Sequence, residues 1–206
     1  MAEFDFAALS VPERSRLLLR LVAPRPIAFV SSRSAAGAGN LAPFSFFNAG
    51  GYSPASLVVS PVNDRHGSAK HTLRNIEQTR EYVINVVTSA MATRMNRASF
   101  EYADGIDEFD AAGFTRAPSV KVGPPGVLES PARLECRLFQ VVRHGSGPGA
   151  GNYIIGELVH ATVRDDVLTD GLPDDAKLDM LARLGADHYL RVTPELLFDI
   201  PRPTSG

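Results

Sequence analysis

The sequence reads Asn40-Leu41-Ala42-Pro43-Phe44-Ser45-Phe46-Phe47-Asn48 at the point where its strand pattern is interrupted. A half-buried strand alternates apolar and polar residues and an amphipathic helix repeats every three to four residues, but this segment does neither. Three phenylalanines surround Ser45, and Pro43 has no backbone N–H to donate. Together with residues 25–32 and the turn-rich residues 34–39, the segment predicts a strand, a turn and an interrupted strand.

Two interpretations of this interruption are open. The phenylalanines are typical of an ordinary core, and Asn40 and Ser45 are typical of turns. A broken strand, however, leaves backbone N–H and C=O groups that need water, a side chain or a ligand. A flat polar ring with apolar faces, such as a flavin, fits a site of this kind.

The rest of the chain predicts a mainly β fold. Apolar runs between turn residues predict strands at 27–32, 56–60, 82–87, 132–143 and 152–164. Helices are predicted at 11–21 with Ser10 as cap, at 70–77 with Ser68 as cap, at 89–98, and as a short helix-like run at 178–184. The leucines of the first helix are expected to cover the sheet. Many short strands with few helices indicate an antiparallel β-barrel with peripheral helices.

Residues 100–118 are interpreted as an excursion over the barrel. The segment carries an acidic cluster formed by Asp104, Asp107, Glu108 and Asp110. Their spacing does not match a calcium-binding loop, so we expect them to form a solvated acidic face.

The composition is typical of one globular domain covering residues 1–206. Hydrophobic residues make up 44% of the chain and charged residues 21%, and the formal net charge is -2 at pH 7. This charge gives no general attraction to nucleic acid or to anionic membranes, so neither is an expected partner. The N-terminus has no basic start and no long apolar run, which predicts no signal peptide, no membrane span and a cytoplasmic location.

Motifs of several other enzyme classes are absent from the sequence. The single cysteine, Cys136, alternates with Leu134 and Leu138 and is expected to be a small buried residue. The histidines show no metal-ligand spacing, and there is neither a Gly-x-Ser-x-Gly elbow nor a His-Glu-x-x-His motif. The glycine-rich residues 145–151 contain a proline and precede a strand, unlike a phosphate-binding loop. A hydrolase or a metalloenzyme is therefore poorly supported.

The start of the predicted helix 70–77 has the groups expected of an anion site. Hydroxyl groups, an ammonium group and the N–H groups of a first helical turn occur there within a few residues of one another. The residues are Ser60, Ser68, Lys70, His71 and Thr72. Each also has an ordinary interpretation, because Ser68 can be a helix cap, Lys70 a solvated side chain and His71 a surface residue.

Six segments, in this order, resemble the flavin reductase-like family of FMN-binding split barrels, which includes reductase components of two-component monooxygenases and flavoredoxin. Together they cover nearly the whole chain. They are RPIAFVSS (25–32), NLAPFSFFN (40–48), KHTLRNI (70–76), ESPARLEC (129–136), NYIIGELVH (152–160) and RLGADHY (183–189).

The resemblance implies an antiparallel FMN-binding split β-barrel with peripheral helices, and a homodimer with FMN near the subunit interface. It implies FMN phosphate contacts at Ser60, Lys70 and Thr72, although the family often has an aspartate where this chain has His71. The flavin ring would lie against Ala42, Pro43, Phe44 and Ser45. Asn40 and Asn48 complete the candidate cofactor-binding residues. FAD is the alternative flavin.

Three further residues, His160, Tyr189 and Arg25, are considered for the site. The resemblance places His160 on a strand near the open face of the flavin, so we expect a catalytic role in nicotinamide binding, and replacement by alanine should then raise the Michaelis constant for NADH. A histidine of the core or rim is the other interpretation. Tyr189 is a candidate for the edge of the site. Arg25 either contacts an anion or pairs with a surface carboxylate.

The resemblance implies an NAD(P)H-dependent flavin reductase that transfers a hydride from the nicotinamide to flavin N5. The reduced flavin would then supply a partner monooxygenase or another electron acceptor. Two alternatives are an FMN-binding electron carrier similar to flavoredoxin and a flavin oxidase similar to pyridoxamine-phosphate oxidase. The sequence does not choose between NADH and NADPH, because none of its arginines lies in a motif for the ribose phosphate.

Overall fold

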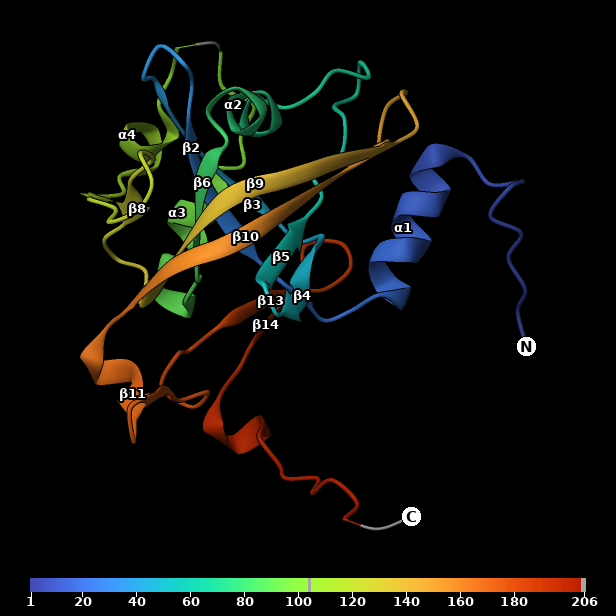
Figure 1. Cartoon of the computed structure of the whole chain (residues 1–206). Coiled ribbons are helices and arrows are strands. Elements are labelled where there is room, and N and C mark those ends of the chain that lie inside the picture. Colours follow the sequence, from blue (N-terminus) through green and yellow to red (C-terminus); the bar gives the residue numbers. More distant parts are fainter. Residues whose placement is uncertain (104, 205–206) are drawn as a thin grey trace.

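The computed structural model describes residues 1–103 and 105–204, and its main feature is a twisted sheet of seven antiparallel strands (Figure 1). The strands lie in the order β3-β2-β6-β9-β10-β5-β4. Their bounds are β2 (Ala28–Arg33), β3 (Gly39–Phe44), β4 (Phe47–Tyr52), β5 (Ala55–Val59), β6 (Glu81–Asn85), β9 (Ala132–His144) and β10 (Gly151–Val163). The fold is therefore mainly β and antiparallel, as predicted.

Smaller elements surround this sheet. A three-stranded sheet contains β1 (Arg25–Pro26), β13 (Leu181–Arg183) and β14 (Tyr189–Arg191), and two short hairpins contain β7 (Arg116–Ala117) with β8 (Gly126–Val127) and β11 (Leu168–Thr169) with β12 (Leu172–Pro173). The helices are α1 (Val11–Leu21), α2 (His71–Thr79), α3 (Ala92–Arg97) and α4 (Glu108–Ala112), with 3-10 turns at Ser89–Met91, Asp165–Val167 and Pro194–Leu196. No helix in the described ranges has both the length and the apolar character needed to cross a bilayer.

The local predictions hold best for long, strongly patterned segments. The five predicted strands correspond to β2, β5, β6, β9 and β10, and the last two form the predicted hairpin. The run 178–184 is not helical, which corrects its interpretation. Leu178, Leu181 and Leu184 are spaced like one face of a helix, but the segment pairs with β1 on one side and β14 on the other as β13. Lys70, not Ser68, is the N-cap residue of α2.

The barrel predicted from the sequence is not closed. The sheet is open, and β3 and β4 lie at its two edges although only two residues separate them in the chain. At the edge formed by β3, the N–H of Leu41 donates to the Glu108 carboxylate and not to a neighbouring strand. In the two-residue linker between β3 and β4, the carbonyl of Phe46 accepts from the N–H of Ser60. The edge of β3 thus stays available to line a cavity.

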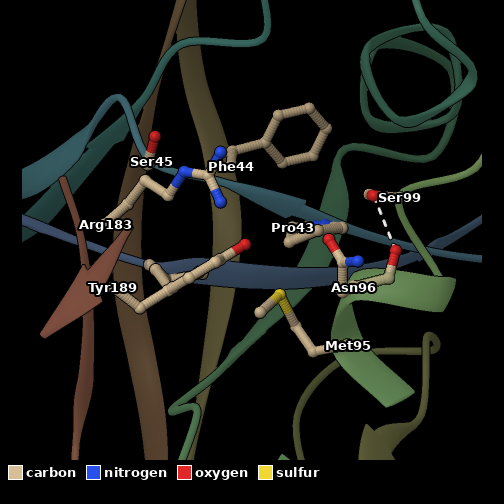
Figure 2. Close-up of a pocket in the computed structure, with 9 residues that line it drawn as sticks. Pro43, Phe44, Ser45, Met95, Asn96, Ser99, Arg183 and Tyr189 are labelled. Carbon is tan, nitrogen blue, oxygen red and sulfur yellow. Dashed lines mark hydrogen bonds between the residues drawn. The ribbon is translucent and has the colours of Figure 1, made fainter. Parts of the chain in front are cut away.

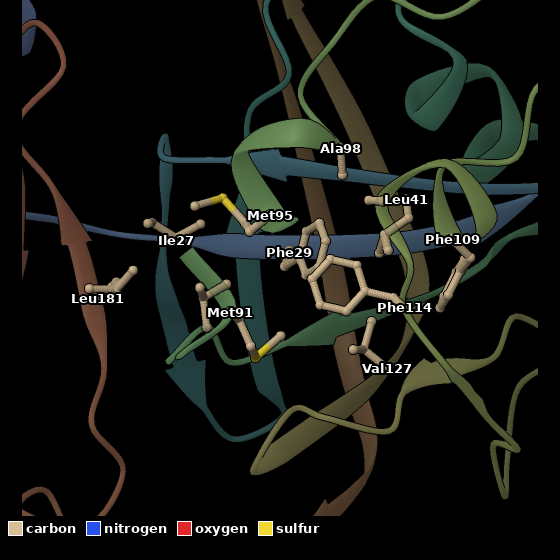
Figure 3. Packing of buried hydrophobic residues seen from close by; sticks show 12 residues of the cluster. Ile27, Phe29, Leu41, Met91, Met95, Ala98, Phe109, Phe114, Val127 and Leu181 are labelled. Carbon is tan, nitrogen blue, oxygen red and sulfur yellow. The ribbon is translucent and has the colours of Figure 1, made fainter. Parts of the chain in front are cut away.

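Strand β2, next to the edge strand β3, is buried on both faces and separates two hydrophobic clusters. Phe29 belongs to the cluster formed with α3, α4 and β8, where it packs edge-to-face on Phe114 with ring centroids 5.1 Å apart (Figure 3). Ala28 and Val30 belong to the other cluster, which α2 covers and which contains Cys136. Cys136 is fully buried, as predicted, and burial raises the pKa of its thiol to about 12. The thiol is therefore unreactive near neutral pH.

Helix α1 does not cover the sheet as expected. It begins at the predicted cap, where Ser10 and Glu13 form a capping box, but none of its residues is buried. Leu21 is 68% exposed. Figure 1 shows the helix beside the sheet, with the N-terminal segment beyond it. The leucine spacing predicts the helix correctly, but its apolar face is only partly covered in the described part of the chain.

Candidate functional site

A cavity of about 600 Å³ lies along the free edge of β3. One wall is β3 with the linker to β4, and the facing wall is the segment from Ser60 to the first turn of α2. The segment after α3 closes a third side. The lining residues are Asn40, Ala42, Pro43, Phe44, Ser45, Phe46, Ser60, Val62, Asp64, Ser68, Ala69, Lys70, His71, Thr72, Arg74, Ala98, Ser99, Phe100, Glu101, Tyr102 and Glu108. Pockets of this size hold ligands as large as a nucleotide cofactor.

One end of this cavity is suited to an anion. Helix α2 starts here, and the N–H groups of a first helical turn have no carbonyl partner within the helix. Lys70 and Arg74 add positive charge, and Ser60 and Ser68 add hydroxyl groups. Two acidic residues lie nearby: Glu101 is 3.9 Å from the Arg65 guanidinium, and the Asp64 carboxylate already accepts from the N–H groups of Ser68 and His66. These bonds, opposed by partial burial, hold the pKa of Asp64 below its usual range.

The other end of the cavity is flat and largely apolar. It is formed by Ala42, Pro43 and the aromatic rings of Phe44 and Phe46. Because β3 is an edge strand, its outward backbone groups beyond Leu41 have no strand partner. A planar heterocycle can pack on these side chains and bond to the exposed backbone groups.

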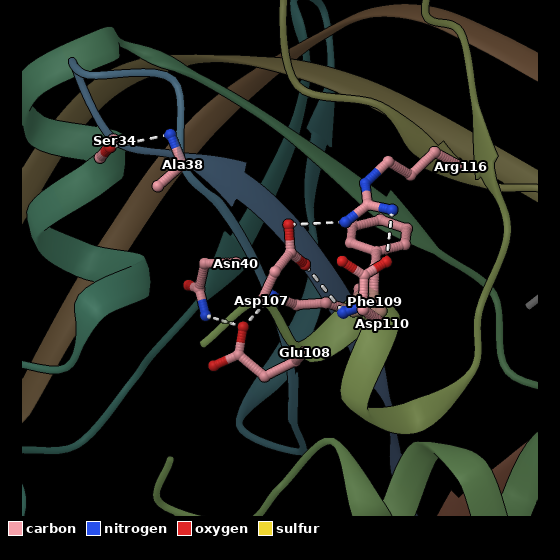
Figure 4. A network of polar contacts seen from close by, with 9 residues as sticks. Ser34, Ala38, Asn40, Asp107, Glu108, Phe109, Asp110 and Arg116 are labelled. Carbon is pink, nitrogen blue, oxygen red and sulfur yellow. Dashed lines mark hydrogen bonds and ion pairs between the residues drawn. The ribbon is translucent and has the colours of Figure 1, made fainter. Parts of the chain in front are cut away.

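A buried hydrogen-bond chain links β3 to α4 and α2, and Figure 4 shows its bond from Asn40 to Glu108. The Asn40 side chain donates from Nδ2 to Glu108 Oε2 at 3.0 Å, and its Oδ1 accepts from Thr72 Oγ1 at 2.7 Å and from Ser32 Oγ at 3.2 Å. The N–H of Leu41 also donates to Glu108 Oε2, at 3.0 Å. Glu108 is 7% exposed. One carboxylate on α4 therefore positions β3 and, through Asn40, the start of α2.

Residues next to Glu108 keep α4 in place. Asp107 caps the helix by accepting from the N–H of Phe109 at 2.9 Å. Arg116 bonds to both Asp107 and Asp110 and lies 4.9 Å above the Phe109 ring (Figure 4). These bonds raise the pKa of Arg116 and lower that of Asp110. The prediction that these acidic residues form a solvated face is therefore wrong for Glu108, which is buried. Asp104 lies outside the described residues.

Arg25 does not pair with a surface carboxylate in the described residues. Its side chain is buried, and it donates to the carbonyls of Leu19 and Val22 at 2.7 and 2.5 Å and to that of Leu184 at 2.9 Å. A longer bond of 3.4 Å joins its Nε to Ser45 Oγ. Arg25 therefore ties the end of α1 to the three-stranded sheet. Burial, and then the nearby charge of Arg183, lower its pKa.

Eight of the ten residues named from the sequence line the same cavity. They are Asn40, Ala42, Pro43, Phe44, Ser45, Ser60, Lys70 and Thr72. Asn48 and His160 are not among its lining residues. Asn48 is exposed on β4 and donates to the carbonyl of Ala49. The cofactor contacts of all ten residues stay predictions.

His160 lies on β10 beside a buried carboxylate. Its Nδ1 is 3.3 Å from Glu135 Oε1, close enough for charge attraction, but this contact lacks the geometry of a hydrogen bond. Glu135 also accepts from the N–H groups of Val120, Lys121 and Val122, and so fastens their loop to the sheet. The role of His160 in nicotinamide binding stays a prediction.

Glu135 gives the fold a dependence on pH. Burial alone would raise its pKa, but the three backbone N–H groups and His160 outweigh burial and lower the pKa. A carboxyl whose pKa is lower in the folded state stabilises the fold above its unfolded pKa, near 4.3, and this stabilisation is lost as pH falls through the folded value. We expect urea unfolding to show a loss of stability below about pH 4.

The variant Glu135→Gln should be less stable at neutral pH by about 1–2 kcal/mol and should lose less stability on acidification. Glu157→Gln is the matched control, because Glu157 is exposed on β10. Equal acid sensitivity of wild type and Glu135→Gln would contradict this assignment.

The sequence interpretation missed two parts of the cavity. No local pattern separates the buried carboxylate of Glu108 from the acidic residues beside it in the sequence. The segment Ser99–Tyr102 contributes two aromatic rings, Phe100 and Tyr102, which pack edge-to-face with centroids 5.1 Å apart. In the described ranges, no group of three or more His, Cys, Asp or Glu side chains is arranged to hold a metal ion.

Comparison with known proteins agrees with this architecture. Residues 19–177 match the family model of the flavin reductase like domain. An uncharacterized protein, BH2278 of Halalkalibacterium halodurans, is 37% identical over 96% of this chain and 94% of its own length. A nitrilotriacetate monooxygenase component B from Bacillus cereus has a similar structure, with a TM-score of 0.91, 27% identity and coverage of 97% of this chain and 98% of its own.

A split-barrel-domain protein from Shewanella frigidimarina also has a similar structure, with a TM-score of 0.82, 26% identity and coverage of 98% of this chain and 100% of its own. The fold and the cavity thus define a protein of the flavin reductase type. The chain belongs to the flavin reductase like domain family.

Proposed function

We propose that this protein is an NAD(P)H-dependent flavin reductase that binds FMN in the large cavity. The observation that supports this most is the convergence of four separate stretches of sequence on one cavity with two unlike ends. One end carries Lys70, Arg74 and the start of α2, and the other carries Pro43, Phe44 and Phe46. A flavin mononucleotide has the same polarity, because it joins a phosphate to a flat, largely apolar ring system.

In this proposal the phosphate lies at the start of α2, bound by Lys70, Ser60 and backbone N–H groups. The Thr72 hydroxyl already donates its hydrogen to Asn40, so Thr72 would contribute its N–H group instead. The ring packs between Pro43 and the aromatic side chains, and backbone groups of residues 42–45 bond to its polar edge. Bound flavin would supply hydride acceptance from NAD(P)H. The residues described here bind and orient the ring and exclude water.

The protein would pass electrons on to a partner. The structurally similar protein from Bacillus cereus is a monooxygenase component, which supports supply of reduced flavin to a monooxygenase. We further propose a homodimer, consistent with the only partly covered apolar face of α1, and a cytoplasmic location, where reduced nicotinamide coenzymes occur.

Binding of the phosphate group is tested by titrating the protein with FMN and with riboflavin, which lacks the phosphate. Lys70→Gln should weaken FMN binding about tenfold or more and leave riboflavin binding unchanged. Lys121→Gln is the control, because Lys121 is exposed on a loop away from the cavity. Equal losses for FMN and riboflavin would place the phosphate elsewhere.

Turnover is tested by following NADH and NADPH oxidation with added FMN, FAD or riboflavin. Oxidation that increases with added flavin is the expected result, and its rate with each coenzyme identifies the donor. A protein that binds FMN but oxidises neither coenzyme would be an electron carrier, and the reductase proposal would be wrong.

A further inference from the structure

Two arginine side chains meet at one place in the three-stranded sheet. Arg25 on β1 and Arg183 on β13 lie directly opposite each other in the antiparallel pairing of these strands. Like charges at opposite positions of a sheet repel each other and destabilise the pair. Burial, and after it the charge of Arg183, lower the pKa of Arg25, so the two guanidinium groups do act on each other. Such a pair favours the presence of negative charge nearby.

The described residues do little to neutralise this pair. Arg25 is 4% exposed and donates to three backbone carbonyls and to the Ser45 hydroxyl, so all these partners are neutral. Arg183 bonds to the carbonyl of Ala186, and the Asp187 carboxylate lies 3.6 Å away. The Asp187 side chain is fully exposed, so water screens its attraction. Most of the positive charge is therefore left unbalanced.

This charge lies beside a wall of the large cavity. A second, smaller cavity of about 190 Å³ contains Arg183 and shares the wall of residues 43–45 with the large one (Figure 2). Among the described residues that line the small cavity, Arg183 is the one that carries a charge. Ser45 Oγ accepts from Arg25 Nε at 3.4 Å, which leaves the hydroxyl hydrogen to donate elsewhere. The two arginines thus make the wall at Ser45 electropositive.

The reaction of the proposed function creates negative charge in the large cavity. In that reaction the C–H bond at nicotinamide C4 breaks, and an N–H bond forms at flavin N5 with both electrons of the broken bond. The coenzyme gains one positive charge, and the flavin ring, which is neutral when oxidised, gains one negative charge. The phosphate charge is unchanged. A fixed cation beside the ring therefore stabilises the transition state and the reduced ring more than the oxidised ring.

We propose that Arg25 and Arg183 stabilise the negative charge of the reduced flavin ring and so raise its reduction potential. Arg25 acts through the Ser45 hydroxyl, which makes it a positioning residue, and Arg183 acts through its charge. Both guanidinium groups are in place before the hydride arrives, so no rearrangement is needed at that moment. The inference rests on the proposed function for the presence of the flavin, and it adds the residues that set the potential.

The proposal is tested by measuring the midpoint potential of bound FMN during reduction by dithionite, with a dye of known potential and no nicotinamide coenzyme. Arg25→Gln should weaken the binding of reduced FMN, relative to oxidised FMN, about tenfold. For a two-electron couple this lowers the potential by about 30 mV. Arg183→Gln should lower it by a smaller amount, because the Arg183 side chain is 25% exposed and is partly screened.

Further variants separate charge from structure. Arg25→Lys keeps the charge but cannot reproduce the planar fork of hydrogen bonds, so its potential should stay near that of the wild type. Arg164→Gln is the matched control, because Arg164 pairs with exposed Asp166 and lines neither cavity, and its potential should equal that of the wild type. Thermal melts establish that each variant folds. Arg183→Gln carries the test if Arg25→Gln does not fold.

Wild-type potentials in the folded glutamine variants of Arg25 and Arg183 would overturn the proposal. A potential in Arg25→Lys as low as in Arg25→Gln would also overturn it, because the role of Arg25 would then be structural. A wild-type protein that binds FMN but oxidises neither NADH nor NADPH would reject the reductase function alone, since dithionite still reduces the bound flavin. A wild-type protein that binds no FMN would overturn both proposals.

Discussion

Replacing Gly156 by alanine is expected to destabilise the protein by about 3 kcal/mol. Gly156 lies at a bulge of β10, and a Cβ atom there would overlap the hydroxyl oxygen of Tyr82 and come within 2.8 Å of its Cζ. The Tyr82 ring is fully buried, so it cannot move aside without disturbing its neighbours. Urea unfolding of wild type and Gly156→Ala measures the difference.

Two further variants isolate the cause. Gly147→Ala is the matched control in the same hairpin, because a Cβ at Gly147 would meet no atom within 4 Å, and it should leave stability unchanged. Tyr82→Phe should be tolerated, because the buried Tyr82 hydroxyl has only the weak Cys136 thiol beside it and makes no hydrogen bond to nitrogen or oxygen in the described residues. The double variant Tyr82→Phe/Gly156→Ala should recover part of the loss. No recovery would mean that the overlap with the hydroxyl is not the main cause.

Replacing Glu108 by alanine is expected to cost about 2–4 kcal/mol of stability and to weaken FMN binding about tenfold. Glu108 Oε2 accepts from both Asn40 Nδ2 and the N–H of Leu41, so its loss leaves two buried donors unpaired. Asn40 would then no longer hold Thr72 at the start of α2. Thermal melts and FMN titration measure the two effects.

Glutamine at position 108 separates hydrogen bonding from charge. Its single carbonyl oxygen can accept both bonds that Oε2 accepts now, so Glu108→Gln should remain close to the wild type. Asp110→Ala is the control on the same helix, because the Asp110 side chain is 74% exposed and its ion pair with Arg116 contributes little. A Glu108→Ala protein with wild-type stability would refute the structural role given to this carboxylate.

Much of the fold follows from local patterns. The helix after Ser10, the helix near Lys70 and the long hairpin of β9 and β10 each depend on spacings within a few residues, and all three form as predicted. Prediction failed where a local pattern had two solutions. The leucines at 178–184 fit a helix by spacing, and pairing with β1 made the segment a strand.

The residues of the candidate site likewise fall into two groups, those that the sequence indicates and those that only the structure identifies. Pro43, the phenylalanines beside it and the cluster around Lys70 stand out in the sequence because each group is unusual for its position. Arg25 and Glu108 do not stand out, since a buried and an exposed charge look alike in a sequence. Their partners are distant in the chain: Arg25 bonds to Leu184, and Glu108 bonds to Asn40.

The sequence by itself determined the antiparallel strands, the helix after Ser10, the interruption at Pro43 and eight of the residues that line the large cavity. These depend on interactions between near neighbours, which spacing and residue type already specify. Only the tertiary structure decided that the sheet stays open at β3, that α1 is only partly covered, and that Glu108 and Arg25 are buried. It also brought Arg183 and Tyr189 to Ser45, because contacts between segments far apart in the chain form only when the whole core packs.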